Sequence, residues 1–283
     1  KASSITPQSY RIRPPAPLVL EWRQSNPGHW EYQKMIPRYE HAGIAAIWTD
    51  EAKLARWDKV ELAVILARSR LELLDQDDAL SIEYHLAHSH VDIPAWLERE
   101  KETGHDLAAY VELRWEGLPV EMRKHFHDGM TSYDTEDPAF VLAIQESSDF
   151  VHDATVALIE EMLELAKRYR YQPMLDRTHG QHAKLASLGS RILMWRTELV
   201  EAHLALIEAK NACYRSRISG AIGTYGGRLT PEIERKALLS LGLAPFYGAG
   251  QIAPRTLYAP IEQAEELVAK VLAKIAIDFQ LVA

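Results

Sequence analysis

The sequence predicts an all-α protein built around a bundle of long helices, with a smaller helical domain before it. Apolar residues keep near-helical spacing without a helix breaker from Pro138 to about Arg170, and again from Ala183 to about Arg217. At 1.5 Å per residue the first helix would be roughly 50 Å long. No segment shows the strict alternation of a strand. Long helices with apolar stripes indicate a bundle whose remaining apolar surface partner subunits can cover.

The chain is predicted to have three regions. Residues 1–37 form an irregular N-terminal arm, because their prolines break any helix. Residues 38–128 form the N-terminal helical domain. There Thr49 precedes acidic residues suited to the positive first turn of a helix that runs to about Leu74, and a second helical segment reaches His90. Residues 129–283 form the central bundle.

Capping signals place the later helices. Asp137 is expected to cap the first long helix and Pro138 to open it. Residues 219–227 form a glycine-rich loop that lacks the lysine of a P-loop and the spacing of a dinucleotide fingerprint, so close backbone approach is the expected role. Thr230 and Pro231 begin a short helix, and a last helix runs to the chain end.

Composition limits the partners. A formal net charge of -8 argues against a general nucleic-acid surface, although it allows a small basic pocket for an anionic metabolite. The single cysteine, Cys213, cannot form an intrachain disulfide and favours a reducing compartment. No apolar run approaches the roughly 20 residues of a membrane helix. We therefore expect a cytoplasmic protein with neither nucleic acid nor membrane as a partner.

The polar stretch RTHGQHA, Arg177–Ala183, lies between the two long helical patterns. A histidine beside Thr178 and just before a helix N-terminus can handle protons next to a bound anion. The alternative is a polar helix-entry turn whose histidines only cap and pack.

Two other polar stretches have functional and ordinary interpretations. His105, in Gly104–Asp106, could donate to an anion, ligate a metal or cap a helix, and these residues alone favour capping. Residues 125–134 offer hydroxyl donors that suit a carboxylate or phosphate, or form an ordinary polar turn. The histidine string at 85–90 lacks a recognisable ligand set, so no metal site is predicted.

Seven motifs follow one another along the chain: Met35–Tyr39, Ile47–Leu54, Gly104–Asp106, Gly129–Asp134, Arg177–Ala183, Ile218–Tyr225 and Gln251–Arg255. In their order and spacing, the chain from about residue 35 to its end resembles the adenylosuccinate lyase family, within the fumarase/aspartase superfamily.

The resemblance implies the superfamily's long-helix bundle and a β-elimination. Adenylosuccinate would give AMP and fumarate, and the succinyl-aminoimidazole carboxamide ribotide of purine biosynthesis would be cleaved in the same way. This chemistry needs a base for the carbon, donors for the resulting carboxylate and an acid for the departing nitrogen. The resemblance implies no cofactor and no metal. It also implies a homotetramer whose active sites are shared between subunits.

The resemblance also assigns residues by their place in the motifs. The implied general acid is His179, with His105 supporting it and binding substrate. Arg38 and Tyr39 match the pair that holds the nucleotide phosphate. The implied substrate-binding residues are Arg38, Tyr39, Asp106, Thr131, Ser132, Thr178 and Gln251.

Departures from the family keep alternatives open. The superfamily's mobile loop, which reads like S-S-x-M-P-x-K-x-N-P and carries the serine base, is absent from these residues, as is the domain after it. We expect the sequence to be a fragment of a longer enzyme. The alternatives are a superfamily lyase that acts on another succinyl-amine, a non-catalytic helical scaffold, and a metal-dependent phosphohydrolase that uses His105 and Asp106. The smaller departures are Gly104, Pro138, Lys184, Leu185 and Thr256.

Overall fold

The computed structural model describes residues 37–282, most of which are helical, and it confirms the all-α class. The chain divides into two compact units, Lys1–Glu40 and His41–Ala283. In the first unit the described residues form the 3-10 helix η1, Pro37–Tyr39. The predicted arm otherwise lies outside the described residues. The second unit holds all the other elements.

The second unit begins with five helices, and Thr49 caps the longest of them, α2, as predicted. Its side-chain oxygen accepts a backbone N–H of the first turn at 3.2 Å. The helix ends before the expected Leu74 because the chain turns at Glu72, whose φ of 59° lies in the left-handed region. The five helices are α1 (Ala42–Ile47), α2 (Asp50–Ser69), α3 (Gln76–His88), α4 (Ile93–Thr103) and α5 (Asp106–Gly117).

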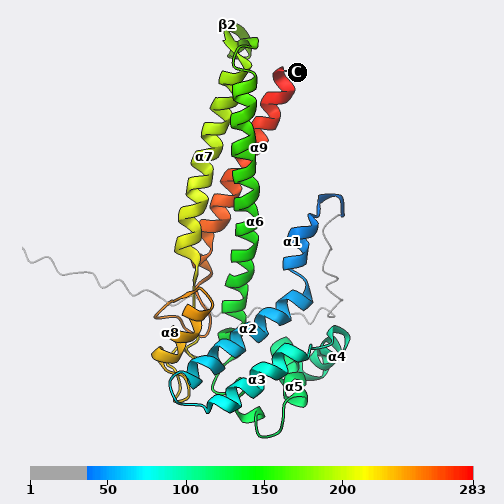
Figure 1. The fold of residues 1–283 in the computed structure, drawn as a ribbon, viewed down its shortest axis with the longest axis vertical. Coiled ribbons are helices and arrows are strands. Elements are labelled where there is room, and N and C mark those ends of the chain that lie inside the picture. The colour runs from blue at the N-terminus through cyan, green and yellow to red at the C-terminus, as the bar shows by residue number, and fades with distance from the viewer. Residues whose placement is uncertain (1–36, 283) are drawn as a thin grey trace, which may run out of the picture. The chain divides into compact units, whose positions relative to one another are not determined.

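Three long helices, α6 (Ser132–Arg168), α7 (Leu188–Cys213) and α9 (Ala259–Val282), run side by side and confirm the predicted bundle (Figure 1). With 37 residues, α6 is roughly 55 Å long. The three helices share a buried core, so burial of their apolar stripes holds them together. This core consists of Ile159, Met162, Ala166, Ile192, Trp195, Leu199, Ala202, Val268 and Val271.

The prediction that Asp137 caps α6 and Pro138 opens it is wrong. The helix begins at Ser132, after a capping box in which the carboxylate of Asp134 accepts the N–H of Thr131 at 2.8 Å. Pro138 lies inside the helix, where its missing N–H removes one helical hydrogen bond. The Asp137 carboxylate instead binds a loop from later in the chain, as described below.

The expectation of no strands, with RTHGQHA leading directly into a helix, is also wrong. Strands β1 (Pro173–Thr178) and β2 (Gln181–Ser187) form an antiparallel hairpin at one end of the bundle (Figure 1). His179 and Gly180 join them, with φ values of 53° and 72°. Positive φ at both loop residues is typical of the type I′ turn that matches strand twist. Helix α7 therefore begins at Leu188, later than predicted.

The remaining elements connect the bundle to the N-terminal helices. Helix α8 (Pro231–Ser240) begins after its cap Thr230, as predicted. The close approach expected of the glycine-rich loop is confirmed, since a Cβ on Gly223 would lie 2.0 Å from the carbonyl oxygen of Ala249. The predicted boundary between residues 128 and 129 stays a prediction. The other elements are η2 (Arg123–His125), the parallel pair β3 (Arg215–Ser216) and β4 (Ala244–Pro245), and η3 (Arg255–Leu257).

Within residues 37–282, no helix combines the length and the apolar character that crossing a membrane requires.

Candidate active site

The N-termini of α5 and α6 bring four of the predicted site residues together. His105 is the N-cap of α5, and its Nδ1 accepts the N–H of Leu107 at 3.2 Å. Its Nε2 lies 3.0 Å from the hydroxyl of Ser132, at the first position of α6. In the neutral tautomer that accepts at Nδ1, the proton is on Nε2 and points toward Ser132; Nδ1 also lies 3.3 Å from Oδ1 of Asp106. The capping role expected of His105 is confirmed, and capping leaves its other nitrogen facing the hydroxyl.

Lys53 on α2 holds the carboxylate of Asp106. Its ammonium lies 2.8 Å from Oδ2 of Asp106 and over the rings of Trp57 and Trp96, at 4.6 and 5.2 Å from their centroids. Burial alone would raise the pKa of Asp106, but the ammonium and the N–H of Leu107 outweigh it and lower that pKa. Asp106 therefore stays ionised and fixed in place.

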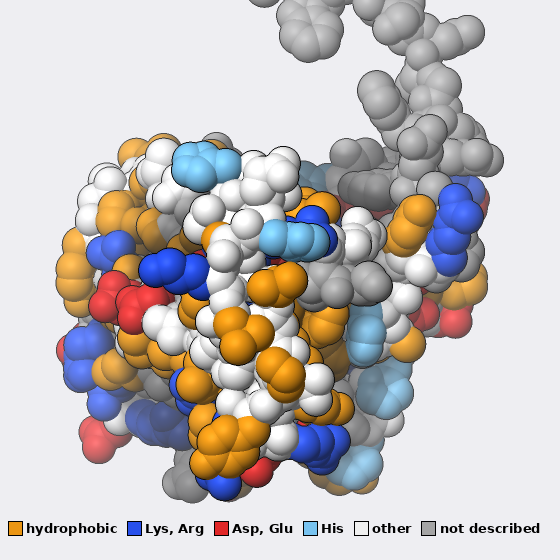
Figure 2. All heavy atoms as spheres, turned by 90° about the horizontal axis from the view of Figure 1, so that it is seen from above, with side chains coloured by type: hydrophobic (Ala, Val, Ile, Leu, Met, Phe, Trp, Pro, Cys, Tyr) orange, Lys and Arg blue, Asp and Glu red, His pale blue; other side chains and the backbone are white. Residues whose placement is uncertain are grey.

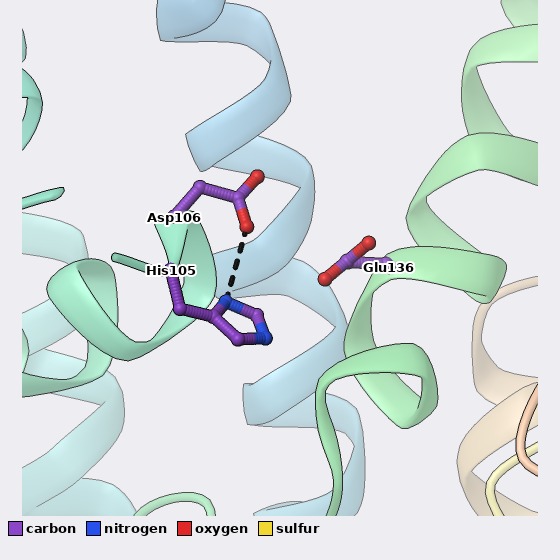
Figure 3. Close-up of side chains that lie close together, drawn as sticks. All are labelled: His105, Asp106 and Glu136. Carbon is purple, nitrogen blue, oxygen red and sulfur yellow. Dashed lines mark ion pairs between the residues drawn. The ribbon is translucent and has the colours of Figure 1, made fainter. Parts of the chain in front are cut away.

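Glu136 lies beside His105 and Asp106, although the sequence analysis did not single it out. It lies one turn after Ser132 on α6, and its carboxylate faces His105 and Asp106 (Figure 3). The ligand atoms of these three side chains lie within 4.8 Å of one another. Burial, and then the Asp106 carboxylate, raise the pKa of Glu136. The helical spacing from Ser132 was the signal that could have identified it.

His105, Asp106 and Glu136 form a group of the kind that can ligate a metal ion, as the phosphohydrolase alternative requires. However, Lys53 already binds one oxygen of Asp106, and Leu107 N–H the other. A cation would have to compete with an ammonium for this carboxylate. The Lys53 ammonium therefore opposes binding of a divalent metal at the Asp106 carboxylate.

Two cavities flank these residues. One, of about 260 Å³, is lined by Lys53, Glu136 and Arg255 together with aromatic rings, among them Trp57 and Tyr133. Lys53 and Arg255 are paired with the carboxylates of Asp106 and Asp137, and the aromatic walls suit a planar ring system. A larger cavity of about 700 Å³, where α2 ends and α3 begins, holds none of the predicted site residues.

The other of the two cavities that flank these residues has a volume of about 240 Å³. It is lined by Ser132 and by His127, which the sequence analysis also missed. His127 Nδ1 lies 2.7 Å from Oε1 of the buried Glu61. Burial opposes a charge on His127, but the Glu61 carboxylate prevails and raises its pKa. The raised pKa favours the protonated form of His127 in the cavity that Ser132 also lines. Its partner comes from α2, far away in the sequence, so no local pattern could identify it.

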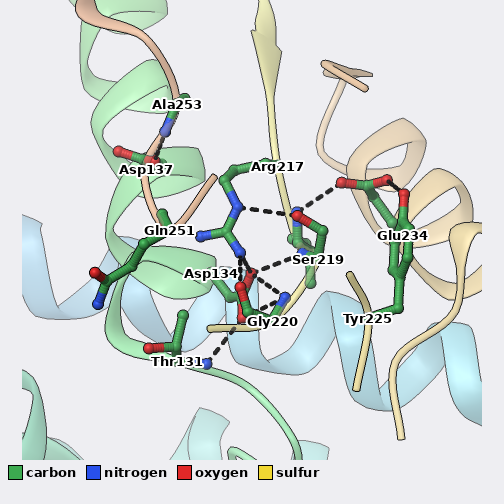
Figure 4. Close-up of polar contacts among 11 residues, drawn as sticks. Thr131, Asp134, Asp137, Arg217, Ser219, Gly220, Tyr225, Glu234, Gln251 and Ala253 are labelled. Carbon is green, nitrogen blue, oxygen red and sulfur yellow. Dashed lines mark hydrogen bonds and ion pairs between the residues drawn. The ribbon is translucent and has the colours of Figure 1, made fainter. Parts of the chain in front are cut away.

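Gln251 lies at the same end of α6. It belongs to the loop that Asp137 anchors through the N–H of Ala253 at 2.6 Å (Figure 4). Asp137 also binds the guanidinium of Arg255 in this loop at 2.6 Å. Arg217 binds the carbonyl oxygen of Gln251 from the other side. The side chain of Gln251 itself is exposed.

The structure does not bring Thr178 and His179 to these residues. They lie at the tip of the β1–β2 hairpin, beyond the C-terminus of α6, whereas Ser132 lies at its N-terminus. The 37 residues of α6 separate the two places by roughly 55 Å. At the hairpin end, hydrophobic side chains lie exposed among basic ones (Figure 2), and Leu175 and Leu185 on the strands are 53% and 74% exposed.

Arg38 and Tyr39 belong to the first unit, where they form part of η1, and both are exposed. Their predicted contact with a nucleotide phosphate stays a prediction. The roles assigned to the other site residues stay predictions in the same sense.

The chain matches the protein family described as Lyase over residues 32–283. It is 32% identical over 246 residues to an adenylosuccinate lyase of Thermotoga maritima, and 30% identical over 246 residues to one of Bacillus subtilis. Each match covers 87% of this chain and 56% of the relative, so the chain spans little more than half the length of these relatives.

Solved structures show the same fold. A fumarate lyase from Mesorhizobium sp. BNC1 matches with a TM-score of 0.77 and 23% identity, over 84% of this chain and 56% of that one. The β-carboxy-cis,cis-muconate cycloisomerase of Acinetobacter calcoaceticus matches with a TM-score of 0.75 and 20% identity, over 84% and 57%. At such identities the likeness concerns the fold alone.

Proposed function

Because the chain belongs to the lyase family over residues 32–283, we propose that its protein eliminates fumarate from succinyl-amines. The substrates proposed are adenylosuccinate, which gives AMP, and the succinyl-aminoimidazole carboxamide ribotide. The observation that carries the proposal is the convergence of His105, Thr131 and Ser132 at the N-terminus of α6. A helix N-terminus with two hydroxyl groups and an imidazole N–H suits the carboxylates of a succinyl group.

The proposed reaction assigns a task to each group. Thr131 and Ser132 hold the succinyl carboxylates, and His105 donates toward the same anion. Asp106, kept ionised by Lys53, accepts hydrogen bonds from the substrate. His179 protonates the departing nitrogen while the carbon–nitrogen bond breaks. The base that takes the proton from the carbon is assigned to the serine loop of the superfamily, so the tests below use the natural full-length protein.

Separation of the residues along α6 supports a shared site. His179 and Ser132 cannot act on one substrate within one chain, because roughly 55 Å of helix lies between them. If a second copy packs antiparallel to the first, its hairpin lies beside the N-terminus of α6 of the first copy. Closed symmetric assembly would then build several equivalent sites. A homotetramer with shared sites is the assembly proposed, and a cytoplasmic location stays a prediction.

Fumarate release from adenylosuccinate by the natural full-length protein tests this function. We expect turnover by the parent and a loss of about 100-fold to 10,000-fold in His179→Ala, the usual contribution of a general acid. The matched control is His182→Ala, on the same exposed hairpin, which should keep turnover close to that of the parent. A folded parent that releases no fumarate would exclude the named substrate and favour another succinyl-amine or the scaffold alternative.

A further inference from the structure

The carboxylate of Asp134, on the first turn of α6, joins two distant segments of the chain. Its Oδ2 accepts the N–H of Thr131 at 2.8 Å. Its Oδ1 accepts the N–H of Ser219 at 2.7 Å, and both oxygens lie 3.1 Å from the N–H of Gly220 (Figure 4). One fully buried carboxylate thus fixes both the start of α6 and the glycine-rich loop.

Arg217 extends this connection to the loop that contains Gln251. Its Nη2 lies 2.7 Å from Oδ1 of Asp134, and neither side chain has any exposed surface. Its Nε donates to the hydroxyl of Ser219 at 3.0 Å, and its other nitrogens donate to the carbonyl oxygens of Gly220 and Gln251. A planar guanidinium can make these contacts at fixed angles, whereas a lysine ammonium cannot.

Thr131 and Gln251, two predicted substrate contacts, are therefore both tied to one buried ion pair. Asp134 binds the backbone of Thr131, and Arg217 binds the backbone of Gln251. Because both charged side chains are buried, neither can touch a substrate. Any effect of the pair on binding has to pass through the segments that it holds, which are the start of α6, the glycine-rich loop and the loop that contains Gln251.

We propose that Asp134 and Arg217 are positioning residues that set the spacing between the Thr131–Ser132 donors and the Gln251 amide. This proposal rests on the function proposed above. A buried ion pair is weak support for a stabilising role, since apolar residues often stabilise a core as well. The pair instead fixes the positions of the segments that it binds, because its hydrogen bonds are made to defined backbone groups of these segments.

Glu234 provides a matched comparison within the same network. It is also buried, and it accepts the N–H of Ile218 at 2.8 Å and the hydroxyl of Tyr225 at 2.7 Å (Figure 4). It holds the glycine-rich loop from the other side but binds neither Thr131 nor Gln251. A variant at Glu234 should therefore disturb the network without changing the spacing of the proposed donors.

The test compares Arg217→Lys with Glu234→Gln in the natural full-length protein. Arg217→Lys keeps the charge beside Asp134 but loses the directed bond to Gln251, so KM for adenylosuccinate should rise about 10-fold, the usual effect of one buried hydrogen bond. The value of kcat should change less than KM does. Glu234→Gln should lower the thermal midpoint and leave KM nearly unchanged. An equal rise of KM in both variants would overturn the proposal.

A double-mutant cycle then asks whether Arg217 acts through Gln251. In a Gln251→Ala background, Arg217→Lys should change KM much less than it does in the parent, because coupled residues are not additive. Independent effects that multiply would contradict the proposal.

Amide hydrogen exchange separates this proposal from the proposed function, since it needs no turnover. Arg217→Lys should speed exchange by about 10-fold or more in segments 129–133 and 250–254, while Glu234→Gln should not. Unchanged exchange in these segments would overturn the positioning role even if the protein cleaves adenylosuccinate. Faster exchange in a protein that does not cleave it would support the positioning role and refute the substrate.

Discussion

Substitution of His127 by alanine should destabilise the protein through the carboxylate that it leaves behind. Glu61 Oε1 lies 2.7 Å from His127 Nδ1, and the two side chains are only 1% and 16% exposed. Removal of one partner from a buried pair usually costs about 3 to 5 kcal/mol of unfolding free energy. We expect the lower end, about 3 kcal/mol, because Thr135 still donates to Glu61 at 2.6 Å.

The pH dependence of this loss has a definite sign. The Glu61 carboxylate, against the effect of burial, raises the pKa of His127 above its ordinary value of 6.5. A raised pKa in the folded protein gives stability that is fully present below 6.5 and is lost as pH rises through the raised value. The difference in unfolding free energy between the parent and His127→Ala should therefore shrink as the pH rises above 6.5 and through the raised pKa of His127.

Urea unfolding followed by circular dichroism, at equal protein concentration, measures this difference. The matched control is His125→Ala. Burial, and then the charge of Lys124, lower the pKa of His125, so its contribution should have the opposite pH dependence. A loss below about 1 kcal/mol for His127→Ala, or a loss that grows with pH, would refute the reasoning about the Glu61 pair.

Two further predictions concern the loops and the Asp106 contact. Gly223→Ala should strongly destabilise the protein, because φ is +78° and the new Cβ would lie 2.0 Å from the Ala249 carbonyl oxygen. Gly226→Ala, where φ is +52° and the space around the residue is open, should cost only about 1 kcal/mol of unfolding free energy. Equal thermal midpoints for the two variants would contradict this prediction. Lys53→Met should remove roughly 1 kcal/mol, a value reduced by solvent screening of a pair that is 39% and 28% exposed. Because Lys53 lowers the pKa of Asp106, the loss of stability in Lys53→Met should disappear as the pH falls below about 3.8. Urea unfolding at acidic pH measures this, and a loss that persists there would contradict the prediction.

The long helices could be predicted from the sequence because their apolar stripes face one another within the chain. Residues such as Trp195 and Leu199 on α7 lie in the shared core, so the stripe and the packing agree. The hairpin could not be predicted in the same way. Most of its side chains are exposed on both faces, so no burial pattern imposes alternation on its sequence. The signal was the His179–Gly180 turn.

The start of α6 was misplaced because two local signals compete there. A proline commonly occupies the first helical turn, and this favoured a start at Pro138. The capping box formed by Thr131 and Asp134 prevails, because Asp134 also binds the glycine-rich loop. Its partners lie about 85 residues away in the sequence, so this reason for the helix start is visible only in three dimensions.

Short motifs identified some residues of the candidate site, but the contacts between distant segments that bring the site together could not be predicted. The family resemblance singled out His105 and Ser132 by their places in its motifs, and the structure places them 3.0 Å apart. Lys53 reaches this site through Asp106, Glu136 lies beside His105 and Asp106, and His127 lines a cavity with Ser132 while it binds Glu61. No short motif encodes these contacts between distant segments. The separation of His179 from Ser132 depends on the length of α6, and it is this separation that motivates a site shared between chains.

Complementation between two inactive variants tests the shared site most directly. Mixed after unfolding and refolded together, His179→Ala and Ser132→Ala chains of the natural full-length protein should regain fumarate release from adenylosuccinate. At a one-to-one ratio, random assembly gives both intact groups to about one quarter of the sites, so about one quarter of the parent turnover is expected. Activity no greater than that of the separate variants, in a mixture that assembles normally, would show that His179 and Ser132 do not meet across chains.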